Sequence, residues 1–439
     1  MTKQEIIKIA KKKKVAFVRL WFTDVLGFLK SFDMPVEELH HALNDGMGFD
    51  GSSIEGFSRI EESDMVVKPD ISTFRIMPWT QEEGTVARMF CDVVEPNGKP
   101  FEGDPRYVLK RNLKEAKKLG YTFNVGPELE YFYFRNAGGT EILDNGGYFD
   151  LTPMDIGQDL RRKTVLALEK MGIDVEYWHH EVASSQHEID LRYNEALLMA
   201  DNVMTYRMVV KEVAMQQNMY ATFMPKPVYG INGSGMHTHM SLFKGKKNAF
   251  FDKNDKNHLS ETAKYFLAGL LKHATEICSV CCQWVNSYKR LVPGYEAPVY
   301  VSWACRNRSA LLRIPMYKPG KEMATRIELR NPDPACNPYL AFSVMLAAGL
   351  EGIKKKYKLP KQVTNNVYSM TEKERKDLGI ASLPDDLYDA IRITEQSPLV
   401  RKALGDKVFE YFIRNKKDEW DDYKKQVTKH ELDRYLAIL

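Results

Sequence analysis

The sequence predicts an α+β protein in which one sheet carries charged side chains on a face. Segments typical of strands alternate with segments typical of helices along the 439 residues. The strand candidate 126–134 places Glu128 and Glu130 on the same face, because successive side chains of a strand point to opposite faces. Like charges stacked on a sheet face destabilise it unless something compensates them.

A second strand candidate, 325–330, repeats this pattern. Arg326, Glu328 and Arg330 take one face, and apolar residues take the other. A bound divalent cation is the usual compensator for clustered carboxylates. The two strands together predict a metal-loaded cavity lined by arginine.

Residues 1–105 are expected to form a first unit of short strands with one or two helices. Two of its segments, 15–22 and 85–93, are typical of strands. The Gly-rich segment 46–53 predicts a loop, and turn signals over 96–105 mark the end of the unit.

Residues 106–439 alternate helices with the polar-faced strands. Helices are predicted over 106–119, over 201–218 and from Asp406 onward. The last residues, 435–439, are apolar and have no obvious partner nearby in the sequence. Burial in a neighbouring subunit and docking on the parent domain are both open.

Composition excludes several classes of protein. A net charge of +4 over this length is too small to indicate nucleic-acid binding. The six cysteines lack zinc-site spacing and fit free thiols in a reducing cytosol. The start of the chain does not resemble a signal peptide, and no apolar stretch is long enough to cross a bilayer. A soluble cytoplasmic protein with no nucleic-acid or membrane partner is therefore expected.

Four segments with this charged pattern carry the prediction of metal binding: 126–134, 179–188, 232–241 and 325–330. They supply five glutamates and a histidine: Glu128, Glu130, Glu181, Glu188, Glu328 and His237. An oxygen-rich set with one imidazole suits magnesium or manganese better than zinc or copper. The set is too large for one such ion that also keeps waters and substrate oxygens, so at least two ions are predicted. Singly, each glutamate pair would more often be a solvated strand face.

Arginines form the second group of candidate site residues: Arg290, Arg306, Arg308, Arg313, Arg326 and Arg330. Arginine recognises carboxylate and phosphate with a planar fork. Together with two metals this indicates phosphoryl transfer. The chain has neither a GxxxxGK[ST] loop nor the kinase motifs, so a nucleotide would be held in another way. Taken singly, each arginine more often makes a surface salt bridge.

Five motifs resemble those of glutamine synthetases of the bacterial and archaeal type I class: residues 49–53, 126–130, 232–237, 289–298 and 326–328. They occur in the same order as in the family and span essentially the whole chain. The compact segment between Glu181 and Glu188 is similar to the shorter, alpha form of that class.

The resemblance implies roles for individual residues. The ligands of the metal on the glutamate side are Glu130, Glu181 and Glu188, and those of the metal on the nucleotide phosphates are Glu128, His237 and Glu328. Glutamate would be held by Asn232, Gly233, Arg290 and Arg330. Nucleotide-pocket positions fall on Glu176, Tyr193, His239 and Ser241, and phosphate contacts on Arg313 and Arg326.

The resemblance also implies the catalytic groups. Asp50 binds ammonium and helps to deprotonate it, with Ser53 and Tyr148 nearby. Arg308 neutralises the transferring phosphoryl group, and Glu296 closes over the reaction. The expected reaction phosphorylates the γ-carboxylate of glutamate with ATP, and ammonia then attacks the acyl phosphate to give glutamine, ADP and phosphate. Magnesium or manganese, two or more ions per subunit, would be the cofactor.

The architecture implied by the resemblance has an N-terminal β-grasp-like domain, 1–105, and a larger catalytic domain, 106–439. The antiparallel strands of the catalytic domain would form a funnel-like site flanked by helices. The assembly would be a dodecamer of two stacked hexameric rings with active sites shared between subunits.

Two positions bear on regulation. Arg59 resembles the arginine used for glutamine feedback in the shorter class. Tyr368 lies near the tyrosine that some members adenylylate, but it lacks the surrounding pattern, so modification is not expected. Regulatory proteins are further candidate partners.

Two rival functions remain at this point. A related ligase would join glutamate to another amine, although Asp50, Ser53 and Tyr148 supply a small cation pocket that favours ammonium. A non-catalytic structural relative would be expected to lose metal ligands, and all six are present.

Overall fold

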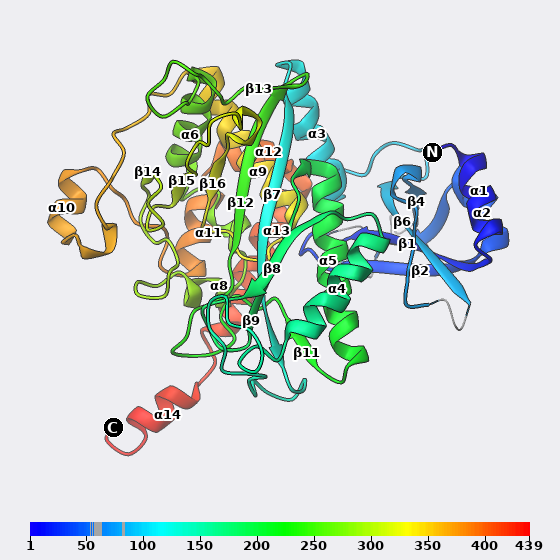
Figure 1. Cartoon of the computed structure of the whole chain (residues 1–439), viewed down its shortest axis with the longest axis horizontal. Coiled ribbons are helices and arrows are strands. Elements are labelled where there is room, and N and C mark those ends of the chain that lie inside the picture. The colour runs from blue at the N-terminus through cyan, green and yellow to red at the C-terminus, as the bar shows by residue number, and fades with distance from the viewer. Residues whose placement is uncertain (53, 55, 57–63, 81–83) are drawn as a thin grey trace.

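The computed structural model describes residues 1–439 except 53, 55, 57–63 and 81–83. The predictions for Ser53 and Arg59 fall outside the described residues. Figure 1 shows a smaller sheet with two helices at the right and a larger body around a long sheet.

The smaller sheet has the strand order β2-β1-β6-β4-β3, with β5 paired to β6. Its strands are β1 (Val15–Thr23), β2 (Leu29–Pro35), β3 (Met47–Asp50), β4 (Asp64–Pro69), β5 (Arg75–Ile76) and β6 (Thr85–Val94). The central strands β1 and β6 run parallel, and the other pairs are antiparallel. Helices α1 (Lys3–Lys12) and α2 (Leu39–Asn44) contact this sheet. The strands expected over 15–22 and 85–93 are confirmed.

The prediction of a loop over 46–53 is wrong for its first half. Met47–Asp50 form strand β3, which pairs with β4 from Met47↔Val67 to Asp50↔Asp64. Gly46 makes the turn into the strand with a φ of +85°, which glycine adopts readily. The glycines indicated a loop, but pairing with β4 decides the structure of the segment.

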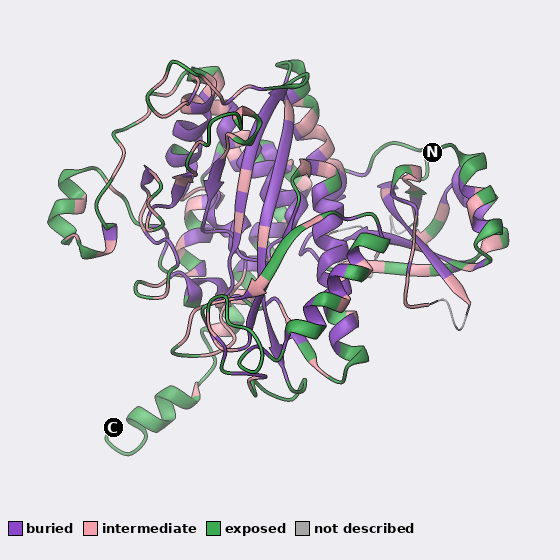
Figure 2. Cartoon of the chain, in the orientation of Figure 1, coloured by how far each residue is buried: buried purple, intermediate pink, exposed green. Residues whose placement is uncertain are grey.

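The larger sheet has the strand order β14-β15-β16-β12-β7-β9-β8, with three short strands paired at its margins. Its strands are β7 (Thr122–Phe134), β8 (Val175–His180), β9 (Gln186–Leu191), β10 (Asn194–Glu195), β11 (Tyr220–Thr222), β12 (Met236–Lys244), β13 (Lys247–Asn248), β14 (Trp303–Cys305), β15 (Leu312–Ile314) and β16 (Ile327–Leu329). The long strands β7 and β12 run side by side through its middle, and much of their length is buried (Figure 2).

The sheet is antiparallel as predicted, with one exception. Strands β14 and β15 are parallel, with Trp303 opposite Leu312. Arg306 adopts a φ of +67°, and the residues that follow carry the chain back to the level where β14 began. The short segment between β14 and β15 therefore lets the two strands run parallel, whereas a hairpin would make them antiparallel.

Helices surround the larger sheet. They are α3 (Pro105–Lys118), α4 (Gln158–Lys170), α5 (Ala196–Gln216), α6 (Glu261–His273), α7 (Cys278–Cys281), α8 (Val285–Arg290), α9 (Pro338–Lys355), α10 (Glu372–Asp377), α11 (Leu387–Glu395), α12 (Pro398–Leu404), α13 (Asp406–Tyr423) and α14 (Lys429–Tyr435). Helices α3 and α5 pack on β7, and α9 packs on α3, α5 and α6. Among the described residues no helix is long and apolar enough to span a membrane.

The buried aromatic side chains lie under the middle of the larger sheet. Tyr131 and Tyr133 of β7 point away from the face that holds Glu128 and Glu130, because they occupy the alternate positions of the strand. Both are fully buried, and Tyr131 packs edge-on against Tyr206 of α5. The same alternation therefore builds a hydrophobic core on one side of β7 and a polar face on the other.

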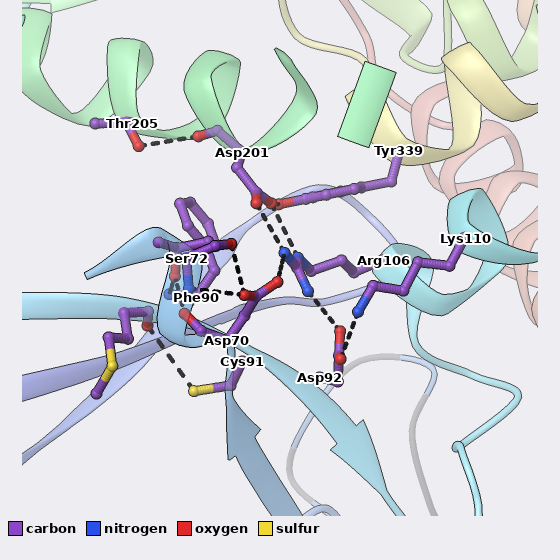
Figure 3. Close-up of polar contacts among 12 residues, drawn as sticks. Asp70, Ser72, Phe90, Cys91, Asp92, Arg106, Lys110, Asp201, Thr205 and Tyr339 are labelled. Carbon is purple, nitrogen blue, oxygen red and sulfur yellow. Dashed lines mark hydrogen bonds and ion pairs between the residues drawn. The ribbon is translucent and has the colours of Figure 1, made fainter. Parts of the chain in front are cut away.

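A buried arginine joins the two sheets. Arg106 of α3 is 2% exposed and ion-pairs with Asp70 and Asp92 of the smaller unit at 2.7 and 2.6 Å, and with Asp201 of α5 at 2.9 Å (Figure 3). The Tyr339 hydroxyl donates to Asp201 at 2.7 Å. Burial opposes the charge, but Asp201 and the other carboxylates hold the pKa of Arg106 well above its ordinary value.

We predict that Arg106→Met lowers the free energy of unfolding by about 3–5 kcal/mol, since it leaves buried carboxylates without their partner. Chemical denaturation would measure the loss. The matched control is Arg162→Met, because Arg162 pairs with Asp159 on the exposed face of α4, where an ion pair contributes little. Equal stability of the two variants would contradict this account of the junction.

Candidate active site

A cavity of about 670 Å³ opens on the polar face of the larger sheet. Fifteen of the predicted site residues line it: Glu128, Glu130, Tyr148, Glu181, Glu188, Asn232, Gly233, His237, His239, Arg290, Glu296, Arg308, Arg313, Arg326 and Arg330. They come from segments far apart in the sequence. The sheet and its loops therefore gather most of the predicted residues around one space.

Strand register explains why the charged side chains meet. Three rows cross the sheet on the face of Glu128 and Glu130, and successive rows lie two residues apart along β7. The first row is Arg313, Glu328, His239 and Gly126; the second is His237, Glu128 and Asp190; the third is Glu130, Glu188 and His179. Directly opposed side chains on one face of a sheet interact, so pairing alone brings distant glutamates together.

Glu328 is fully buried between two arginines. Its carboxylate ion-pairs with Arg313 of the neighbouring strand β15 and with Arg330, two residues further along the chain. Burial opposes ionisation, but His239 and Arg330 lower the pKa of Glu328 to about 2. The carboxylate is therefore charged in the folded protein.

Glu128 lies between two histidines. His239 Nε2 is 2.7 Å and His237 Nδ1 is 3.3 Å from its oxygens. Arg326 Nε donates to His239 Nδ1 at 3.1 Å, which leaves Nε2 to face Glu128. Burial would raise the pKa of Glu128, but His239 and His237 hold it well below its ordinary value.

Glu130 and Glu188 behave in the opposite way. Burial and then the charge of Glu181 raise the pKa of Glu130 to about 8. Burial and then Asp190 raise the pKa of Glu188 well above its ordinary value. Burial and the repulsion between clustered carboxylates thus favour the protonated form of both acids.

The donor set fits divalent cations. Atoms of Glu128, His239 and Glu328 lie within 4.8 Å of one another, and so do those of His179, Glu188 and Asp190. These clusters are rich in oxygen and have one imidazole each, a composition that suits magnesium or manganese. A cation would take the place of the protons on Glu130 and Glu188.

The sequence analysis missed His179 and Asp190 and gave His239 a different role. The sequence carries a signal for Asp190, which follows Glu188 at the alternating spacing of a strand, whereas His179 stands opposite Glu188 only through the pairing of β8 with β9. A third cluster of Asp144, His180 and His187 lies behind the sheet. There Asp144 is 2.9 Å from His180 and accepts a hydrogen bond from Ser185 N, so it supports the turn after Glu181.

Arg290 is held by the backbone. Its guanidinium is 2% exposed and donates to the carbonyl oxygens of Asn331 at 2.7 Å and Arg330 at 3.1 Å. In this arrangement it shapes the cavity wall at the segment that follows Glu328. Its contact with glutamate stays a prediction.

A loop that we call the flap, residues 291–298, follows α8 and borders the cavity. Glu296 has a φ of +56° and accepts a hydrogen bond from Asn232 Nδ2 at 2.9 Å. Tyr295 beside it also lines the cavity. The flap therefore reaches the loop that carries Asn232 and Gly233.

A second cavity of about 300 Å³ shares Glu128, His239 and Arg326 with the first. It is also lined by Glu176, Tyr193 and Ser241, which the sequence analysis assigned to nucleotide binding. Polar and aromatic side chains bound it, a lining that suits a planar base with a sugar. The shared residues place it next to the acidic clusters.

Asp50 lines neither cavity. It ends β3 in the smaller sheet, is exposed, and accepts a hydrogen bond from Ser52 N at 2.8 Å. Tyr148 does line the first cavity and stacks on Phe149 with ring centroids 4.1 Å apart. Asp50 therefore lies outside the cavity that Tyr148 lines.

Comparison with known families decides the identity. The family model for the glutamine synthetase catalytic domain matches residues 102–435, and the model for the glutamine synthetase beta-Grasp domain matches residues 14–96. The chain belongs to the glutamine synthetase family. The smaller sheet with its helices is the β-grasp domain that the sequence predicted, and the α+β class is confirmed.

Curated relatives agree over the full length. Glutamine synthetase of Methanosarcina mazei is 54% identical and covers 100% of this chain and 98% of its own. That of Clostridium saccharobutylicum is 52% identical, with coverage of 99% and 98%. The chain is therefore a type I glutamate–ammonia ligase, and it makes glutamine from glutamate and ammonium with ATP. The rival functions, another amine or no catalysis, are not favoured.

Solved structures share the fold. The GmaS/ADP complex is 31% identical with a TM-score of 0.90, covering 98% of this chain and 99% of its own. The glutamine synthetase of Plasmodium falciparum is 26% identical with a TM-score of 0.89 and covers 99% of both chains. As in the family generally, the reaction uses ATP and divalent metal ions.

We predict that Glu328→Ala abolishes turnover and weakens divalent-metal binding by more than the roughly 10–100-fold that loss of an outer partner costs. Calorimetric titration with Mn²⁺ and an activity assay would measure both effects. Glu328→Gln keeps the shape of the side chain and should fail in the same way. Glu351→Ala, on the remote helix α9, is the control. Full turnover of Glu328→Ala in trace metal would contradict the assignment.

Proposed function

We propose that the three charged rows of the larger sheet hold two magnesium or manganese ions and the phosphates of ATP, and that the loops around them hold glutamate. The observation that carries this proposal is the meeting of four predicted glutamate ligands and the arginines around one cavity, with the fifth, Glu328, buried against two of these arginines. Glu130, Glu181 and Glu188 would hold one ion, and Glu128, His237 and Glu328 the other. His239, His179 and Asp190 adjoin these sets.

Bound divalent ions would offset the negative charge of the phosphates during transfer. The residues of the chain do the rest. Glu176, Tyr193, His239 and Ser241 would bind the nucleotide in the second cavity, and Arg313 and Arg326 would contact its phosphates. Asn232, Gly233, Arg290 and Arg330 would orient glutamate so that its γ-carboxylate faces the γ-phosphate.

Arg308 would neutralise the transferring phosphoryl group. It is exposed on the loop between β14 and β15 and lines the cavity near Tyr148. A planar guanidinium can offer two parallel hydrogen bonds to phosphoryl oxygens. Its stabilisation would be greatest when charge spreads over those oxygens in the transition state.

The second half of the reaction needs a proton acceptor and a dry site. Asp50, with Ser53 and Tyr148 nearby, would bind ammonium and take its proton, and ammonia would then attack γ-glutamyl phosphate and release phosphate. Glu296 on the flap would close over this intermediate, because water competes with ammonia for it.

We also propose a dodecamer of two hexameric rings with active sites shared between subunits, and a domain boundary at residues 105–106. The exposed position of Asp50 supports donation to the site of a neighbour. Helix α14 projects from the body (Figure 1), and the tail beyond it exposes 78% of Leu436 and 98% of Leu439. Such an apolar tail suits burial by another subunit.

Two further proposals concern regulation. We propose Arg59 as the residue for glutamine feedback, and regulatory proteins as candidate partners. Tyr368 is half-buried with its hydroxyl hydrogen-bonded to Ala297 O, which supports the proposal that it is not modified.

We predict that Arg308→Ala folds and binds ATP but lowers kcat by about 10³-fold, with a smaller effect on KM. Arg308→Lys should not restore the rate fully, because the planar fork is lost. Steady-state kinetics with Arg392→Ala, a substitution on the remote helix α11, as the control would measure the split. A change confined to KM would move Arg308 to ground-state binding.

We predict that Asp50→Ala and Glu328→Ala are each nearly inactive but partly restore activity when their subunits are mixed. If subunits exchange at random, about a quarter of shared sites would combine an intact Asp50 with an intact Glu328. A tag on one variant would confirm the mixed oligomers. Mixed oligomers that recover no activity would show that each site lies within one chain.

A further inference from the structure

The backbone of the flap adopts a conformation at Glu296 that neighbouring residues must hold in place. Its Glu296 adopts a φ of +56°, and a non-glycine residue holds such a conformation only where its surroundings impose it. Pro293 and Gly294 are exposed, whereas Tyr295 and Glu296 line the cavity and Ala297 is buried. The contacts on either side of Glu296 therefore decide where its carboxylate lies.

On one side of Glu296, the ammonium of Lys226 lies over the ring of Tyr295, with Nζ 3.7 Å from the ring centroid. The same Nζ donates a hydrogen bond to Ile231 O. An ammonium over an aromatic face is attracted by the ring, and more strongly when water is excluded. Lys226 thus joins the flap to the loop that carries Asn232.

The backbone of Lys226 is itself fixed. Its N–H donates to Asn286 Oδ1 at 2.7 Å, and Asn286 Nδ2 donates back to its carbonyl oxygen at 3.0 Å. Asn286 belongs to α8, the helix from which the flap begins. These two hydrogen bonds therefore join Lys226, which contacts Tyr295 of the flap, to the helix from which the flap begins.

On the other side of Glu296, the hydroxyl of Tyr368 donates to Ala297 O at 2.5 Å. The Tyr368 ring lies 6.0 Å from Tyr300, and Arg375 stacks on Tyr300 at 4.2 Å. Leu383 N donates to Val299 O at 2.8 Å. These contacts join the C-terminal end of the flap to residues 368–383, which follow α9.

We propose that Lys226 and Tyr368 are positioning residues that hold the flap over the cavity, Lys226 acting through Tyr295 and Tyr368 through Ala297. The inference rests on the proposed role of Glu296 and adds the residues that keep it in place. Lys226 does not line the cavity, whereas Tyr368 does.

The chemistry gives these contacts a measurable consequence. When the flap is closed, ammonia attacks the acyl carbon of γ-glutamyl phosphate, the bond from that carbon to the phosphate oxygen breaks, and glutamine and phosphate form. When it opens early, the oxygen of water attacks the same carbon, and glutamate and phosphate form with release of a proton. The second route consumes ATP without making glutamine.

The test is the ratio of glutamine formed to ADP formed, with ammonium both saturating and omitted. Lys226→Met and Tyr368→Phe should lower this ratio at least about twofold and raise glutamate-dependent ATP hydrolysis without ammonium. Lys226→Arg should restore the ratio, because a guanidinium also stacks on an aromatic ring. A general loss of folding would lower both products and leave the ratio unchanged.

The matched control is Lys272→Met, because Lys272 lies over the Tyr357 ring at 4.3 Å and lines neither cavity. Tyr295→Leu should lower the ratio as Lys226→Met does. The variant that combines Lys226→Met with Tyr295→Leu should lower it no further. Independent, multiplying effects would show that Lys226 does not act through Tyr295.

The outcomes separate this inference from the proposed function. If the unaltered enzyme makes one glutamine per ADP and both variants keep that ratio, the inference is overturned while the function stands. If the unaltered enzyme makes no glutamine from ammonium, the function itself fails.

Discussion

Repulsion between carboxylates on adjacent strands is the constraint on which the rest of this structure depends. β7, β9 and β16 bring four of the glutamates onto one face of one sheet, with β12 between β7 and β16, and backbone pairing fixes them there. Such a face is stable only if each charge has a partner or loses its ionisation. Glu328 and Glu128 have cationic or imidazole partners that lower their pKa, whereas burial and neighbouring acids raise the pKa of Glu130 and Glu188. The same arrangement that costs stability prepares the site for cations and phosphates.

The remaining structure holds this face in place. Tyr131 and Tyr133 anchor the far side of β7 in a packed aromatic core, so the strand cannot slip by one residue without exchanging its two faces. The turn after Glu181 is supported by Asp144, and the cavity wall is shaped by Arg290. The flap then closes one margin of the cavity through contacts on both sides of Glu296. Paired strands thus carry the charged groups, and the flap beside them is a loop held by contacts on both sides of Glu296.

Alternation of side chains was enough to predict the polar face of β7 and β12, since every second residue of a strand lies on the same face. It could not predict β3, because the glycines of 46–53 favour a turn and only the partner β4 makes the segment a strand. The parallel β14–β15 pair was missed for a similar reason, as it depends on the backbone at Arg306. His179 needed the register of β8 against β9, which a single strand does not reveal, whereas Asp190 follows Glu188 at the alternating spacing of one strand. Asp50 lines neither cavity of the chain, so its proposed role rests on the sequence resemblance.

The central proposal is that two divalent cations bind in each subunit and relieve the repulsion on this face. Crystals grown with Mn²⁺ and ATP would test it directly through anomalous scattering at the manganese edge. The account predicts two separate peaks in the cavity, one beside Glu130, Glu181 and Glu188 and the other beside Glu128, His237 and Glu328. A single peak, or none among these carboxylates in active enzyme, would contradict it.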